Sequence, residues 1–209
     1  MAAGRVARAF KKSADAGGVI LFADEVGFLM TPCVKRTWAK RACTPVVPYR
    51  NRRQKKVSVL GAVALHPASG AVGLLCDFHP DSYVRGEQAA AFLHRVLAEF
   101  PGDMPVDVVW DNLSAHRAPI VREVVAANPR LTLHYLPPYA PDLNPVEGVW
   151  ALTKYHRMAN HTIDDLDRLH AEAARHLADV GRDPNLLRSC FKGAGLATSP
   201  DAVSLPSAQ

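Results

Sequence analysis

The sequence lacks long hydrophobic runs. Its longest apolar stretches, Val19–Ala23 and Val57–Leu65, are far shorter than the roughly 18 to 20 residues that a membrane-spanning helix needs. A secretory leader is also missing, because the basic N-terminus precedes no apolar region with a cleavage site. We therefore expect a cytoplasmic protein without a membrane partner.

Paired cysteines are missing as well. The four cysteines are widely scattered and form no CxxC pair, which argues against a zinc site or a redox dithiol; they are Cys33, Cys43, Cys76 and Cys190. With 209 residues, 48% hydrophobic and 22% charged, the chain has the composition of one medium-sized folded domain.

Acidic residues are absent from one stretch, residues 35–56, which we call the basic segment. The chain carries a net charge of +5, and all of the positive excess lies in this segment. A dense basic run with aromatic residues to stack favours contact with a nucleic-acid backbone over a merely solvated surface. The candidate DNA-binding residues are Lys35, Arg36, Trp38, Lys40, Arg41, Arg50, Arg52, Arg53, Lys55 and Lys56.

The order of patterns predicts an α/β fold with a mixed sheet. Apolar runs predict buried strands at 19–23 and 106–110, a hairpin at 57–65 and 71–78, and a further strand at 131–136. Residues 31–48 contain several prolines and predict an edge strand or an excursion. Helical spacing predicts helices at 89–100 and 120–128, a helix beginning at Asn144, and a last long helix over Ile163–Leu177.

Three carboxylates stand where those elements begin or end. Asp24 follows the first strand, Asp111 follows the strand at 106–110, and Glu147 falls in the first turn of the helix that Asn144 caps. Two or three convergent carboxylates suffice to hold a hard divalent cation such as Mg²⁺. Each acid alone also has a plain explanation as a turn or capping residue.

The sequence contexts of these acids decide between the two interpretations. The strings FADEVGF (22–28), VWDNLSAH (109–116) and LPPYAPDLNPVE (136–147) closely resemble the catalytic blocks of bacterial IS630-type insertion-sequence transposases, of the Tc1/mariner group. The string RTWAKRACTP (36–45) resembles a further block, in which Ala42 stands where the family usually has glycine. The 35 residues between Asp111 and Glu147 are close to the family's spacing.

The resemblance runs from about residue 19 to 155 and implies a ribonuclease-H-like catalytic domain, which we expect over residues 19–193, after a linker or remnant at 1–18. Residues 194–209 are small, polar and unpatterned, which predicts a flexible tail. It implies two Mg²⁺ ions, or Mn²⁺ in their place, with Asp24 bridging both, Asp111 on one and Glu147 on the other. The implied reaction is hydrolysis of double-stranded DNA at the element's ends, followed by attack of the 3′-hydroxyl on target DNA. The resemblance also implies a homodimer on DNA, located at the nucleoid. A separate helix-turn-helix protein is a further implied partner, since full-length members carry such modules before the catalytic domain.

Neighbours of the three acids are candidates for supporting roles. Asn112, His116 and Asn144 are expected to orient the ligands or contact phosphate, although turn and cap roles fit each equally well. Glu25 would point away from the site if strand alternation persists, so it is left out of the ligand set.

Several other interpretations compete. A serine hydrolase built on Asp111, Ser114 and His116 lacks a GxSxG elbow. A ribonuclease H or resolvase-like nuclease would use the same fold, but the third block argues against it. The main alternative is a truncated, catalytically idle transposase remnant that only binds DNA through the basic segment.

Overall fold

The computed structural model describes residues 12–47, 55–100, 102–138, 140–196 and 198. Its centre is a five-stranded sheet with the strand order β3-β2-β1-β4-β5. The first three strands pair antiparallel, and β4 and β5 continue the sheet parallel to β1. Their bounds are β1 Val19–Leu29, β2 Lys56–His66, β3 Ala71–Pro80, β4 Val106–Trp110 and β5 Leu131–Tyr135. The mixed sheet with its antiparallel hairpin confirms the predicted fold class.

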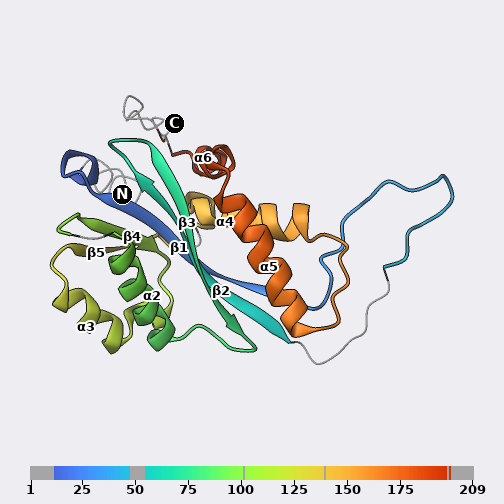
Figure 1. Cartoon of the computed structure of the whole chain (residues 1–209), viewed down its shortest axis with the longest axis horizontal. Helices are drawn as coiled ribbons and strands as arrows, with labels where there is room; N and C mark the ends of the chain where they lie inside the picture. The colour runs from blue at the N-terminus through green and yellow to red at the C-terminus, as the bar shows by residue number, and fades with distance from the viewer. Residues whose placement is uncertain (1–11, 48–54, 101, 139, 197, 199–209) are drawn as a thin grey trace.

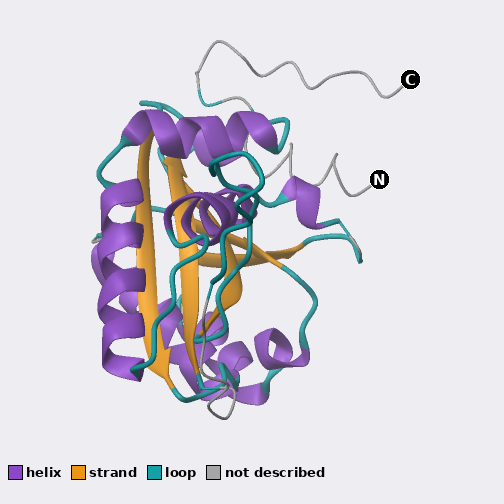
Figure 2. Cartoon of the chain, turned by 90° about the vertical axis from the view of Figure 1, so that its right-hand side faces the viewer, coloured by secondary structure: helices purple, strands orange, loops and turns teal. Residues whose placement is uncertain are grey.

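Helices cover both faces of this sheet (Figures 1 and 2). Ile20 and Phe22 pack into one core with α4, α5 and α6, whereas Val19 and Leu21 pack into the other with α2 and α3. The continuous apolar run of β1 is therefore explained by burial on both sides. The helices are α2 Gly86–Glu99, α3 Pro119–Ala127, α4 Pro145–Ala151, α5 Leu166–Gly181 and α6 Pro184–Gly193.

The sequence predicted that the first strand ends at Asp24, and this prediction was wrong. The strand continues to Leu29, because β2 pairs with it as far as Leu29 opposite Lys56. The parallel partner β4 pairs only with Val19–Phe22. What ends beside Asp24 is therefore the neighbouring strand, and the acid lies in the middle of its own.

The C-terminal helices also differ from the prediction. The predicted last helix begins at Leu166 rather than at Ile163, because the Asp165 side chain caps it and accepts a hydrogen bond from Arg168 N. Ile163 is buried just before the helix. A further helix, α6, was not predicted, although Asp183 at its N-cap and Pro184 at its first position are ordinary start signals.

No helix in the described part of the chain is long and apolar enough to cross a membrane. All four cysteines are free thiols, as expected. The predicted domain limits stay predictions, because much of both chain ends lies outside the described residues.

Candidate active site

Strand alternation brings Asp24 onto the face of the sheet that α4 covers. Its neighbours on that face of β1 are Phe22 and Val26, both of the core beneath α4. Continuing the β1–β4 register beyond Phe22 opposite Val109 sets Asp24 beside Asp111. Two carboxylates thus meet at the carboxyl end of β4, as expected if the two predicted strands are neighbours.

Asn144 brings the third acid to the same place. Its side-chain oxygen accepts a hydrogen bond from Val146 N and so caps α4. Its side-chain nitrogen donates to the carbonyl oxygen of Ala23 at 3.0 Å, which ties the start of α4 to β1 beside Asp24. Glu147, in the first turn of α4, is fixed in this way next to the mid-strand acid. Both the predicted cap and an orienting contact are present in one buried residue.

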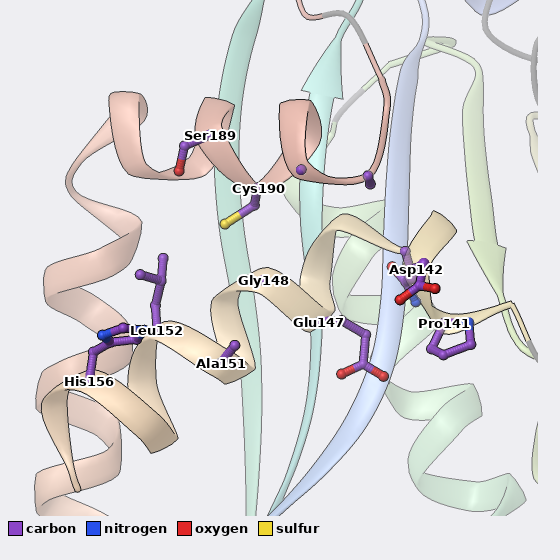
Figure 3. A pocket seen from close by; sticks show the side chains of 12 residues that line it. Pro141, Asp142, Glu147, Gly148, Ala151, Leu152, His156, Ser189 and Cys190 are labelled. Atoms are coloured by element: carbon purple, nitrogen blue, oxygen red, sulfur yellow. The ribbon is translucent and has the colours of Figure 1, made fainter. Parts of the chain in front are cut away.

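One pocket of about 480 Å³ receives all three carboxylates. It is lined by Asp24, Asp111 and Glu147 together with Asn112, Asn144 and the proline-rich loop after β5. A second hollow of about 720 Å³ adjoins it between α4 and α6, and the two share Pro141, Asn144 and Glu147. Figure 3 shows Glu147 projecting from the first turn of α4, with Ser189 and Cys190 approaching from α6. The third acid therefore stands between two openings.

The carboxylates repel one another. Burial, with the charges of Glu147 and Glu25, raises the pKa of Asp24 to about 7. Partial burial also raises the pKa of Glu147, although the nearby Lys154 and a hydrogen bond with Asp24 act in the opposite direction. Without a cation, Asp24 therefore titrates near neutral pH.

This donor set fits divalent cations. Carboxylate oxygens in an open pocket are the ligands that Mg²⁺ and Mn²⁺ prefer, and mutual repulsion of the acids is what a cation relieves. Among the described residues, no three His, Cys, Asp or Glu side chains are gathered closely enough to hold a single ion. An ion bound here would therefore take fewer than three of these carboxylates directly, with water completing its shell.

The comparisons with known proteins agree with this geometry. Residues 19–170 match the family model of DDE superfamily endonucleases. The chain belongs to this family. No curated protein matches the chain.

Solved structures show the fold of this DDE endonuclease domain. The Mos1 mariner paired end complex with Mn has a TM-score of 0.64 at 17% identity, covering 91% of this chain and 56% of that chain. The Mos1 strand transfer complex has a TM-score of 0.62 at 16% identity, covering 91% and 55%. The catalytic domain of Mos1 mariner transposase has a TM-score of 0.52 at 14% identity, covering 92% and 90%. The predicted ribonuclease-H-like fold is confirmed. The chain spans little more than half the length of the chains in the paired end and strand transfer complexes.

Three residues close to the carboxylates were missed from the sequence. Trp150 Nε1 donates to Asp24 Oδ2 at 3.1 Å, and its ring lies over Gly61, the strand partner of Asp24. Lys154, in the π-helical turn η3 (Leu152–Arg157) that continues α4, has a pKa lowered by burial, which Cys33, Glu147 and Asp24 oppose. A glycine inside a strand is a sequence sign of close approach that would have pointed to Gly61.

His116 holds the second acid from the other face of the sheet. It is fully buried, stacks on Trp110 with 4.0 Å between ring centroids, and contacts Asp111 Oδ1 through Nδ1 at 2.8 Å. Its Nε2 lies 2.6 Å from Glu25 Oε1. Glu25 does point away from the carboxylate pocket, as expected, yet it reaches the site through His116. Asn112 lines the pocket and donates to the carbonyl oxygen of Leu136 at 3.1 Å.

The described residues of the basic segment, 35–47 with 55 and 56, do not line the carboxylate pocket. Residues 35–47 form no strand and project from the body of the DDE domain (Figure 1), whereas Lys56 begins β2. Trp38 is 100% exposed, and Ala42 keeps a left-handed turn (φ 65°) without glycine. Asn160 holds the base of the segment through both backbone groups of Lys35. Arg36, Lys40, Arg41 and Lys55 are exposed, Lys56 Nζ lies 3.4 Å from the Tyr83 ring centroid, and Arg50, Arg52 and Arg53 lie outside the described residues.

Proposed function

We propose that this chain is the catalytic domain of a DNA transposase, with residues 19–193 as the working unit. It cuts double-stranded DNA at the ends of a mobile element and joins the freed 3′-hydroxyl to target DNA. The observation that carries the proposal is the meeting of Asp24, Asp111 and Glu147 in one pocket of a DDE endonuclease fold. The IS630-type sequence blocks around these acids support a mobile element rather than another nuclease of the same fold.

Asp24, Asp111 and Glu147 would hold two divalent cations, Mg²⁺ or Mn²⁺, with Asp24 shared between them. Bound cations would stabilise the attacking and the leaving oxygen of an in-line displacement at phosphorus. Burial, together with the charges of Glu147 and Glu25, raises the pKa of Asp24 to about 7, which supports this assignment, because a bound cation would offset the cost of ionising Asp24 there.

The neighbouring residues keep the acids in place. Asn144 anchors the helix start that carries Glu147 to the backbone beside Asp24. Trp150 donates to Oδ2 of Asp24 and so orients this carboxylate. His116 holds one oxygen of Asp111. Fixed carboxylates lose little conformational entropy when ligand and substrate bind, which favours a defined reaction geometry.

DNA is the proposed partner of the basic segment. Its exposed cations and the fully exposed Trp38 suit a phosphate backbone with a surface for stacking. One of the similar structures is named as a Mos1 transposase paired-end complex with the left transposon end, which supports the same partner here. We assign recognition of the element's ends to a helix-turn-helix module, on this protein or a separate one, and pairing of two ends to a homodimer.

Nicking of supercoiled plasmid by purified protein, with and without Mg²⁺ or Mn²⁺, tests the proposal. Asp24→Asn and Asp111→Asn are expected to abolish nicking. Asp103→Asn is the matched control, because Asp103 is an exposed acid that lines neither hollow. Metal-independent nicking, or nicking that survives Asp24→Asn, would overturn the proposed site. DNA binding without nicking by well-folded protein would instead favour the idle remnant that binds through its basic segment.

A further inference from the structure

One cation beside the carboxylate pocket has no role in the site described so far. Arg117 ends the short 3-10 turn η1 (Ser114–Arg117), which follows Asp111 directly. Its guanidinium donates to Asn112 Oδ1. Asn112 in turn lines the pocket that receives Asp24, Asp111 and Glu147. Arg117 therefore lies at the rim of the pocket, where it contacts a lining residue without lining the pocket itself.

The orientation of this side chain is fixed although it is exposed. The guanidinium carbon of Arg117 lies 4.5 Å from the ring centroid of Tyr135, an arrangement in which a planar cation stacks on an aromatic face. The Tyr135 hydroxyl donates to the carbonyl oxygen of His116, which fixes the ring. The Asn112 acceptor is held by its own bond to the carbonyl oxygen of Leu136. An exposed arginine usually samples many rotamers, whereas this one is held by two anchored partners.

The charge of Arg117 is not neutralised. None of the ion pairs among the described residues includes it, whereas Arg95, Arg175 and Arg182 are all paired with acids. A guanidinium has five N–H donors in a planar fork, and the bond to Asn112 uses one of them. Within the described part of the chain, hydrogen-bonding partners of the Arg117 guanidinium other than Asn112 are absent, so its remaining donors can bind the oxygens of an anion, and a guanidinium fork matches two phosphate oxygens well.

We propose that Arg117 binds a phosphate of the DNA strand that enters the carboxylate pocket, which makes it a phosphate-binding residue outside the basic segment. The inference rests on the proposed function, because DNA is the substrate. The three acids make the pocket itself repulsive to a phosphate backbone, so a cation fixed at the rim, close to the acids but bonded to none of them, offsets that repulsion where the strand enters. Tyr135 is its positioning residue.

Binding of a short labelled duplex, followed by fluorescence anisotropy over a range of salt concentrations, tests the inference. Arg117→Gln is expected to weaken binding about five- to ten-fold at low salt and to reduce the slope of log affinity against log salt by about 1, as for one lost phosphate contact. Arg117→Lys should keep the slope but lose part of the affinity, since it loses the stacked fork. Tyr135→Leu should resemble Arg117→Lys.

Arg182→Gln is the matched control, because Arg182 is also exposed but lies at the end of α5 and pairs with Asp179. Binding by Arg117→Gln within two-fold of the original protein, with an unchanged salt slope, would overturn the inference while leaving the proposed function intact. Original protein that neither binds the duplex nor nicks plasmid would overturn the proposed function itself, and the inference with it. Urea unfolding of each variant separates a lost contact from a lost fold, and Arg117→Lys keeps the test valid if Arg117→Gln is unstable.

Discussion

Glu25 Oε1 lies 2.6 Å from His116 Nε2, across 91 residues of sequence. The other ring nitrogen of His116, Nδ1, lies 2.8 Å from Asp111 Oδ1 and 3.3 Å from the backbone carbonyl oxygen of Asp111, so both ring nitrogens face oxygen acceptors. Burial by itself would lower the pKa of His116, but its hydrogen bonds to Glu25 and to the Asp111 backbone, with the charges of Glu25 and Asp111, outweigh burial and raise it. The His116 ring thereby joins an acid on one face of the sheet to the second acid of the site.

His116→Ala is therefore expected to impair both stability and activity. The variant loses the stacking on Trp110 and leaves the partly buried Glu25 without its histidine partner, at a cost of roughly 2 to 4 kcal/mol. Asp111 also loses the bond that fixes it, so the Mn²⁺ affinity of the folded variant should fall. Urea unfolding and Mn²⁺ titration measure the two effects. His134→Ala is the control, because His134 makes a similar 2.6 Å contact with Asp107 outside the pocket and should affect stability alone.

Asp24→Asn should stabilise the metal-free protein at alkaline pH while abolishing nicking. The pKa of Asp24 is raised from 3.8 to about 7, so the folded state binds more protons than the unfolded state between these values. The free energy of unfolding therefore falls as pH rises from about 4 to about 7, and then stays level. The variant should lack this fall and exceed the original protein by roughly 2 to 4 kcal/mol near pH 8. Equal stability of the variant and the original protein at that pH would show that folding does not raise the pKa of Asp24.

Much of this site follows from the sequence, for a physical reason. Asp24, Asp111 and Glu147 were predicted to meet because a strand direction and a helix start are local properties, and short motifs encode them. The mixed fold was predicted on the same ground. The helix starts at Asp165 and Asp183 were missed although their capping signals are equally local. Apolar periodicity extended the first back to Ile163, which belongs to the core but not to the helix.

The supporting contacts were not predictable in the same way. Glu25 was placed correctly on the opposite face by strand alternation, but its meeting with His116 depends on how η1 folds back over the sheet. The bond from Trp150 to Asp24 depends on the register of β1 against β2, which sets Gly61 opposite the acid. Such contacts join positions far apart in the chain, and no local pattern encodes them.

Lys154→Met should strengthen metal binding, whereas a variant that merely lost structure would bind metal more weakly. Lys154 interacts electrostatically with both Asp24 and Glu147, so it competes with a cation for their charge. Near pH 8, where the acids are ionised, its removal should strengthen Mn²⁺ binding, up to about five-fold for a partly exposed charge pair. Lys192→Met, at an exposed position of α6, should leave binding unchanged. Weaker Mn²⁺ binding by Lys154→Met would mean that the lysine supports the acids instead of competing for them.

Trp38→Ala should separate DNA binding from folding. The side chain is 100% exposed, so its removal is expected to change the free energy of unfolding by less than about 0.5 kcal/mol. Loss of a stacking surface should cost about 1 to 3 kcal/mol of binding to single-stranded DNA, measured by anisotropy. Tyr155→Ala, another exposed aromatic residue but one at the base of the basic segment, is the comparison. Unchanged affinity of Trp38→Ala would remove this residue from the DNA surface.

Gly61→Ala tests how far the pocket depends on a missing side chain. A Cβ atom at Gly61 would lie 2.6 Å from Trp150 Cη2 and 3.1 Å from the carbonyl oxygen of Leu75, so the indole must move. Overpacking of this kind costs about 1 to 3 kcal/mol. The shift would also break the hydrogen bond from Trp150 to Asp24. Because this bond lowers the pKa of Asp24, its loss should raise that pKa. The lower pH limit of nicking should therefore move upward.

Two variants make this last prediction specific. Gly73→Ala is the matched control, because Gly73 also lies in a strand and a Cβ there would meet nothing within 4 Å. Trp150→Phe keeps an aromatic ring over Gly61 but removes the indole N–H, so it should shift the pH limit with a smaller loss of stability. If Gly61→Ala lowers stability while the pH limit stays in place, the indole packs against Gly61 without tuning Asp24, and burial together with Glu147 and Glu25 sets the pKa of that acid.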